Sequence, residues 1–260
     1  MGVRVHALGG LIAAIGASSA AEAAIVFTYE APQVQAREFG YQQPGGSLDA
    51  GSLAFATDVI IDLTIDATQE GGPRITVPAT LHFADPSANN FVGPVAGGNG
   101  FYRATASLDF EFRLVNPVAG FGSNVLLAGQ FFDGRLTTFL GSGSVVSAQN
   151  NAGGTLRLFA GDALYDVLGE ADFSLDPGGF AAEGPASVAW SLADFSRTIS
   201  DNDLVEFTPR GEDGGGGKSD FYLPDFQARS SFVASATVVP TPGWIGVAIL
   251  SGAMLLRRRR

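Results

Sequence analysis

YRATASLDFEFRL, residues 102–114, alternates apolar and polar side chains over its whole length. The apolar positions are Tyr102, Ala104, Ala106, Leu108, Phe110, Phe112 and Leu114. The polar positions are Arg103, Thr105, Ser107, Asp109, Glu111 and Arg113. Because successive side chains of a β-strand point to opposite faces, the stretch predicts a long antiparallel strand with one face in a core and the other in water.

Shorter runs with the same period of two occur at residues 58–66, 74–83 and 226–236. Segments rich in glycine, proline and asparagine separate such runs, and this composition is typical of turns. Asp133-Gly134, within residues 131–135, predicts a further tight hairpin turn. A helical pattern is confined to a single turn at residues 164–168.

Many strands and almost no helix predict an all-β fold. The 20 phenylalanines lie mainly at inward positions and supply enough apolar volume to fill the space between two sheets. We therefore expect a single antiparallel β-sandwich of jelly-roll type over residues 24–237. Two consecutive β domains, with a break near residues 141–154, are the alternative.

The chain of 260 residues contains 15 basic and 26 acidic residues and no cysteine. Loss of the two terminal segments described below would remove Arg4, Glu22 and the last four arginines. The remaining body would then hold 10 basic and 25 acidic residues, a net charge of −15. Such a surface repels nucleic-acid phosphates, so no nucleic-acid partner is expected. The lack of cysteine excludes disulfides, thiol nucleophiles and zinc–thiolate sites.

Residues 1–23 have the features of an export signal. Arg4 precedes an apolar stretch at about residues 7–17, and Ala21-Glu22-Ala23 fits the small-x-small pattern at which signal peptides are cleaved. We expect the mature chain to begin near Ala24.

Residues 238–260 combine three features. The proline motif Val239-Pro240-Thr241-Pro242 cannot continue a helix. Residues 243–256 follow as a short apolar run, predicted to be one transmembrane helix. As a helix the run would be about 21 Å long, against a hydrocarbon core of roughly 30 Å. The chain then ends on Arg257, Arg258, Arg259 and Arg260, which favour the cytoplasmic side of a membrane.

This order of proline motif, short apolar helix and terminal arginines resembles the PEP-CTERM sorting signal, with Thr241 in place of the usual glutamate. The resemblance covers about the last 22 residues. It implies that an exosortase, a membrane-embedded protease of Gram-negative bacteria, cuts near the proline motif after transient insertion in the inner membrane. It further implies delivery of the body to the cell surface or to an exopolysaccharide matrix.

No arrangement of catalytic residues stands out in the body. His82 is its only histidine and lies on the polar face of a predicted strand. We therefore expect it to be an exposed surface residue. Asp109 and Glu111 lie close together on one strand face, but Arg103 and Arg113 flank them, as in a solvated face. Nothing marks either carboxyl as the acid in an apolar pocket that a glycosidase needs. We expect no enzyme activity.

Calcium is the best candidate for a bound metal. Calcium takes several oxygen ligands, often from loops. Asp201 and Asp203, with Glu206 nearby, form the densest group of such oxygens, although the spacing is not that of an EF-hand. The alternative is a hydrophilic loop without metal.

The sequence thus predicts an exported, exosortase-processed protein with a structural or adhesive role in the exopolysaccharide of a biofilm matrix. One alternative is a carbohydrate-binding module. Its stacking surfaces would come from Trp190, Tyr102, Tyr165 and Tyr222, although most of these match inward positions. A second alternative is a secreted hydrolase, which would require two carboxylates facing each other across a cleft.

Overall fold

The computed structural model describes most of the body of the chain. The described residues are 24–30, 37–42, 51–56, 58–85, 90–93, 95–98, 101–116, 123–139, 143–150, 155–172, 180, 184–196, 205–207 and 220–238. The expected export signal at residues 1–23 lies outside this set, as does the tail from residue 239 onward. No helix within the described part of the chain has the length and apolar character needed to cross a membrane.

The described elements are almost all strands, and every pairing between them is antiparallel. The first eight strands are β1 (Ala24–Tyr29), β2 (Phe39–Gln42), β3 (Ser52–Phe55), β4 (Ile61–Asp66), β5 (Arg74–Phe83), β6 (Asn90–Val92), β7 (Val95–Gly98) and β8 (Phe101–Leu114). The others are β9 (Val125–Phe139), β10 (Gly143–Asn150), β11 (Leu156–Ala160), β12 (Ala186–Ala193), β13 (Val205–Phe207), β14 (Asp220–Tyr222) and β15 (Phe226–Thr237). A 3₁₀ turn, η2 (Thr68–Glu70), and one helix, α2 (Asp162–Glu170), complete them.

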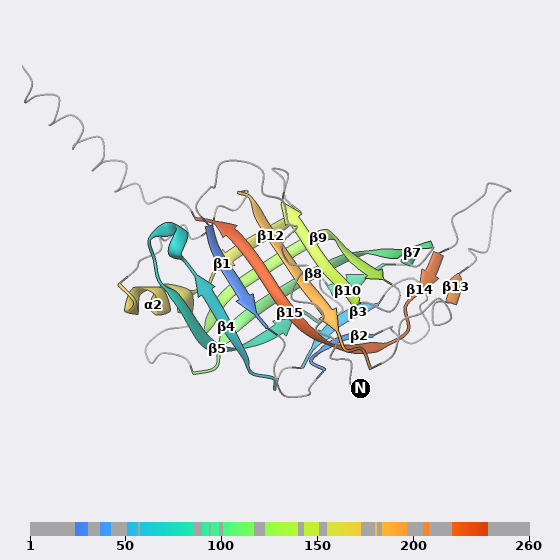
Figure 1. The fold of residues 1–260 in the computed structure, drawn as a ribbon, viewed down its shortest axis with the longest axis horizontal. Helices are drawn as coiled ribbons and strands as arrows, with labels where there is room; N and C mark the ends of the chain where they lie inside the picture. Colours follow the sequence, from blue (N-terminus) through green and yellow to red (C-terminus); the bar gives the residue numbers. More distant parts are fainter. Residues whose placement is uncertain are drawn as a thin grey trace, which may run out of the picture.

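Eight of these strands close into a ring of hydrogen-bonded neighbours. Its order is β1-β4-β5-β8-β9-β10-β12-β15, and β15 pairs again with β1. Figure 1 shows β1, β12 and β15 in a layer that crosses in front of β8 and β9. The all-β antiparallel sandwich expected from the sequence is therefore confirmed, with its two layers joined at both sides through strand pairing.

The order of the strands corrects the jelly-roll detail of that expectation. Around the ring, each strand neighbours the ring strands that precede and follow it in the sequence, which is an up-and-down order. A jelly roll would interleave them as two Greek keys. Alternation of side chains specifies which face of a strand is buried, but it does not specify the partner strand. The segment proposed as a domain break contains β10, which pairs with both β9 and β12.

Aromatic rings from both layers meet in the core. Trp190 of β12 is fully buried and lies edge to face on Phe110 of β8, with ring centroids 5.0 Å apart. Phe232 of β15 lies 4.9 Å from Trp190 and 4.7 Å from Phe112 of β8. Such contacts add about 0.5–1.5 kcal/mol per pair beyond the burial of apolar area. The predicted inward faces of residues 102–114 and 226–236 are buried as expected, as are Ile61, Leu63 and Ile65 of the run at residues 58–66. In the runs at residues 58–66 and 74–83, the inward residues Val59, Ile75, Val77 and Phe83 are only partly buried.

Asp133 and Gly134 lie inside β9 and form no hairpin turn, so that prediction is wrong. The register between β8 and β9 passes from Ala106↔Gly134 to Leu108↔Phe131. Two residues of β9, Phe132 and Asp133, therefore oppose Ser107 alone, which is a β-bulge. Asp133 has a φ of 56°, a left-handed conformation that aspartate adopts more readily than most residues. The Asp-Gly pair meets the needs of a bulge and of a tight turn equally well.

The helix α2 is longer than the single turn expected at residues 164–168. Leu164 and Leu168, four residues apart, share one face and are fully buried. Helix formation here depends on packing against the sandwich, since nine residues are too few to form a stable helix alone.

The first strand of the ring begins beside the end of the last strand of the ring. Ala24 at the start of β1 pairs with Thr237 at the end of β15. Both ends of the body therefore lie side by side at one end of the sandwich.

Candidate functional site

A groove lies on the outer face of the layer built from β5, β8, β9 and β11, with a volume of about 350 Å³. We call it the outer groove. It is lined by His82, Phe83, Ala84, Asp109, Phe110, Glu111, Arg113, Ala128, Gly129, Gln130 and Phe159. The polar members of this set lie at outward positions of their strands, where alternation in the sequence places them.

Strand register sets the outward side chains in rows across the layer. One row joins His82, Glu111, Ala128 and Phe159, each paired with the next on the neighbouring strand. A second row, two residues along the strands, joins Asp109, Gln130 and Arg157. The methyl group of Ala128 is the smallest side chain of the first row, so the row is hollow between Glu111 and Phe159.

Phe159 is the apolar wall of the outer groove. It lies on β11, a strand that pairs with β9. Its side chain is 46% exposed, although its neighbours Leu156 and Leu158 are buried by the same alternation. A large exposed aromatic ring beside a groove is a common feature of ligand sites, because the ring offers a flat apolar surface at little cost in flexibility.

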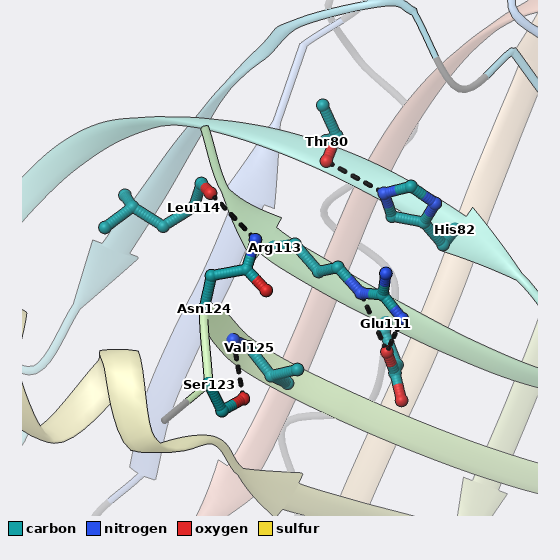
Figure 2. Close-up of polar contacts among 8 residues, drawn as sticks. All are labelled: Thr80, His82, Glu111, Arg113, Leu114, Ser123, Asn124 and Val125. Carbon is teal, nitrogen blue, oxygen red and sulfur yellow. Dashed lines mark hydrogen bonds and ion pairs between the residues drawn. The ribbon is translucent and has the colours of Figure 1, made fainter. Parts of the chain in front are cut away.

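The opposite wall is held by an ion pair and a hydrogen bond, both drawn in Figure 2. Arg113 donates to Oε2 of Glu111 from Nη2 at 2.7 Å and from Nε at 3.0 Å. Nε2 of His82 and the hydroxyl of Thr80 are hydrogen-bonded at 3.0 Å. Partial burial, and then the nearby Arg113, lower the pKa of His82 below its ordinary value, while Glu111 opposes them. His82 is therefore favoured as a neutral ring that can donate and accept hydrogen bonds.

Sequence reasoning placed His82, Asp109 and Glu111 on solvated strand faces, and the structure brings all three to the outer groove. The lining carboxylates, Asp109 and Glu111, both come from β8 and lie two residues apart on one face. They form one wall and do not face each other across the groove. This arrangement lacks the opposed carboxylates that the hydrolase alternative required.

The aromatic side chains considered for sugar stacking prove to be mostly core residues. Trp190 is fully buried, Tyr102 is 5% exposed, and Tyr165 packs against the core from α2. Tyr222 lies on β14, but its side chain is outside the described set. Phe159 was missed, although its outward position in the alternating run at residues 156–160 was a readable signal.

The remaining predicted site residues fall where the structure gives no side-chain information. Asp201 and Asp203 lie outside the described residues, and Glu206 is on β13 with an undescribed side chain. Within the described part of the chain, no three His, Cys, Asp or Glu residues are grouped as metal ligands. The sorting-signal residues are also outside the described set: Val239, Pro240, Thr241, Pro242, Arg257, Arg258, Arg259 and Arg260.

No family model matches this chain, and no curated protein or solved structure is significantly similar to it. Fold and site together define an all-β sandwich protein with a polar groove and an exposed aromatic wall on its outer face.

Proposed function

We propose that this chain is an exported matrix protein whose body binds a neutral polysaccharide in the outer groove without acting on it. One observation carries the proposal. The ring of Phe159 stands exposed beside a hollow floor, facing a row of side chains that form hydrogen bonds.

Sugars need this combination of surfaces. A pyranose ring has apolar C–H faces that lie against aromatic rings, and its edge carries hydroxyl groups that both donate and accept hydrogen bonds. Phe159 supplies the first surface, and His82, Asp109, Glu111 and Gln130 supply partners for the second. The expected charge of −15 on the body opposes an acidic polymer, so the proposed ligand is uncharged.

The proposed role also includes delivery of the body to the cell surface or matrix, directed by the two terminal segments. The pairing of Ala24 with Thr237 supports this delivery, because the expected cuts near Ala24 and near the proline motif would lie beside one another at one end of the body. Neither cut would remove a residue of the strand ring. The exosortase is the proposed partner for the second cut, and the exopolysaccharide is the proposed partner of the mature body.

Affinity gel electrophoresis tests the binding. The probes are a soluble β-glucan, a galactomannan and a xylan, with alginate as the acidic comparison. We expect retardation by at least one neutral polymer. The Phe159→Ala variant should bind that polymer about tenfold more weakly, which is near the largest effect expected for the loss of one aromatic contact. Ile60→Ala is the matched control, because Ile60 is 55% exposed and does not line the groove. Retardation by alginate alone, or equal retardation of the Phe159→Ala variant, overturns the proposal.

Mass spectrometry of the protein recovered from its native cells tests the delivery. We expect a mature chain that starts near Ala24 and ends within the proline motif. A Pro240→Ala, Pro242→Ala double variant should keep its tail. Wild-type protein isolated from the envelope with Arg260 still attached would contradict this part of the proposal.

A further inference from the structure

We infer that the outer groove is one end of a longer surface that binds several consecutive sugar units of a polysaccharide chain. The other end is an aromatic platform formed by Phe91, Ser107 and Phe132. This inference rests on the proposed function and adds to it the size of the ligand.

The aromatic platform is built by strand register. Phe91 of β6 pairs with Ser107 of β8, and the bulge in β9 sets Phe132 opposite the same serine from the other side. Phe91 is 42% exposed and Phe132 is 45% exposed, whereas Ser107 between them is only 2% exposed. Ser107 lies on the outer face by alternation, so its burial on that face shows that neighbouring side chains cover it. Two phenylalanines thus flank a covered serine on the surface of the protein.

Exposed aromatic rings are concentrated on this one face. Among the described residues, the large apolar side chains with high exposure are Ile60, Phe91, Phe132 and Phe159. Three of these four lie on the outward side of β6, β9 and β11, which pair directly with β8 or β9. Single exposed apolar residues need no explanation, but a group on one face marks an interaction site.

A polar row separates the aromatic platform from the wall at Phe159. Asp109, Gln130 and Arg157 form this row, with Gln130 midway along β9 between Ala128 and Phe132. The rows are four residues apart on β9, at Ala128 and Phe132, and a strand rises about 3.3 Å per residue, so the row of Phe132 and the row of Phe159 are about 13 Å apart along the strands. That distance is longer than one pyranose ring. Aromatic contacts at both ends, with hydrogen-bonding groups between them, fit a chain of sugars better than a single sugar.

The same layout argues against an apolar protein partner. A protein-docking surface has an apolar centre with a polar rim. Here the order is reversed along the strands, because the charged and amide side chains lie between the aromatic ends.

Isothermal titration calorimetry with an oligosaccharide series tests the inference. The series runs from disaccharide to hexasaccharide of the neutral polymer bound in the gel experiment. The wild-type chain should bind with affinity that rises with length. The Phe132→Ala variant should lose about tenfold in affinity for the hexasaccharide and little for the disaccharide, whereas the Phe159→Ala variant should bind both saccharides more weakly. Phe132→Tyr, which keeps a ring, should retain the gain with length, and Phe91→Ala should act as Phe132→Ala does.

The outcomes separate this inference from the proposed function. If Phe159→Ala weakens binding but Phe132→Ala leaves the dependence on length unchanged, the inference fails alone. The same holds if wild-type affinity does not rise with length. A folded wild-type chain that binds no saccharide overturns both. Unchanged circular dichroism and thermal midpoint confirm that each variant is folded, as expected for exposed side chains.

Discussion

The carboxylate of Glu38 accepts two hydrogen bonds from Ser230, a residue 192 positions away in the sequence. The backbone N–H of Ser230 donates to Oε1 at 2.6 Å, and its hydroxyl donates to the same oxygen at 2.9 Å. Both residues are buried. Ser230 lies on β15 between the residues that pair with β2 and those that pair with β1. Glu38 thus supplies the acceptor at the point where β15 changes partner.

The hydroxyl of Tyr29 completes this buried group. It lies 2.7 Å from the hydroxyl oxygen of Ser230, whose own hydrogen is directed to Glu38, so Tyr29 is the donor. Burial raises the pKa of Tyr29 far above its ordinary value, and its hydroxyl therefore stays protonated. These hydrogen bonds pair Oε1 of Glu38, the N–H and hydroxyl of Ser230 and the hydroxyl of Tyr29 inside an apolar core. The second carboxylate oxygen of Glu38, Oε2, is buried without a hydrogen-bond partner.

Replacement of Glu38 should therefore be costly. Glu38→Ala leaves the N–H and hydroxyl of Ser230 buried without their acceptor, and we expect it to lower the free energy of unfolding by about 2–3 kcal/mol. Glu38→Gln keeps an acceptor oxygen and should cost less. Glu30→Ala, at an exposed glutamate, is the control. Urea unfolding measures all three, and equal stability of the Glu38→Ala and Glu30→Ala variants would contradict the assigned role.

The ring of Phe110 leaves no space for a side chain at position 129, which is occupied by Gly129. A Cβ at position 129 would lie 2.2 Å from Cζ of Phe110, the ring that contacts Trp190. We expect Gly129→Ala to destabilise the protein by about 1–3 kcal/mol through overpacking. Gly169→Ala is the matched control, since a Cβ there meets no atom within 4 Å and alanine favours the helix α2. Thermal unfolding should show a lower midpoint only for Gly129→Ala, and Phe110→Leu should partly restore it in the double variant.

The bulge in β9 predicts an unusual order of substitutions at position 133. Because Asp133 has a positive φ, Asp133→Gly and Asp133→Asn should be nearly neutral. Asp133→Val should cost about 1–2 kcal/mol, because a β-branched side chain disfavours this conformation. Chemical denaturation of the three variants tests the order. A valine variant as stable as the asparagine variant would show that the bulge is not maintained in solution.

The lowered pKa of His82 predicts a specific loss of stability in mild acid. The unfolded chain takes up a proton at about pH 6.5, while the folded chain does so only at lower pH. The stability that His82 contributes is therefore present in full above about pH 6.5, and it is lost as the pH falls from there to the lower pKa of the folded chain. The stability of wild type relative to His82→Gln should decrease between pH 7.5 and pH 5.5, measured by urea unfolding. Carboxyl groups titrate in both proteins and cancel, so a constant difference would refute the assignment.

Alternation was sufficient to predict β4, β5, β8 and β15, because each of these strands shows its own period within a few residues. Residues 74–83 coincide with β5, and residues 102–114 with all but the first residue of β8. Asp133-Gly134 was misassigned because its preference for positive φ is shared by turns and bulges. Only the neighbouring strands distinguish the two, and these neighbours are distant in the sequence.

The candidate site was predictable in its parts and not in its assembly. The outward positions of His82, Asp109 and Glu111 followed from alternation. Their conjunction with Phe159 depends on the pairing of β11 with β9 and of β9 with β8.

By itself, the sequence determined the class of fold and the division of each strand into a buried and an exposed face. It did so because burial of apolar side chains acts residue by residue along the chain. The tertiary structure alone decided the order of the strands, the closure of β1 on β15, and the gathering of exposed phenylalanines on one surface. These depend on hydrogen bonds between segments more than 200 residues apart, such as Tyr29 and Ser230. No local pattern encodes which distant segment becomes the neighbour.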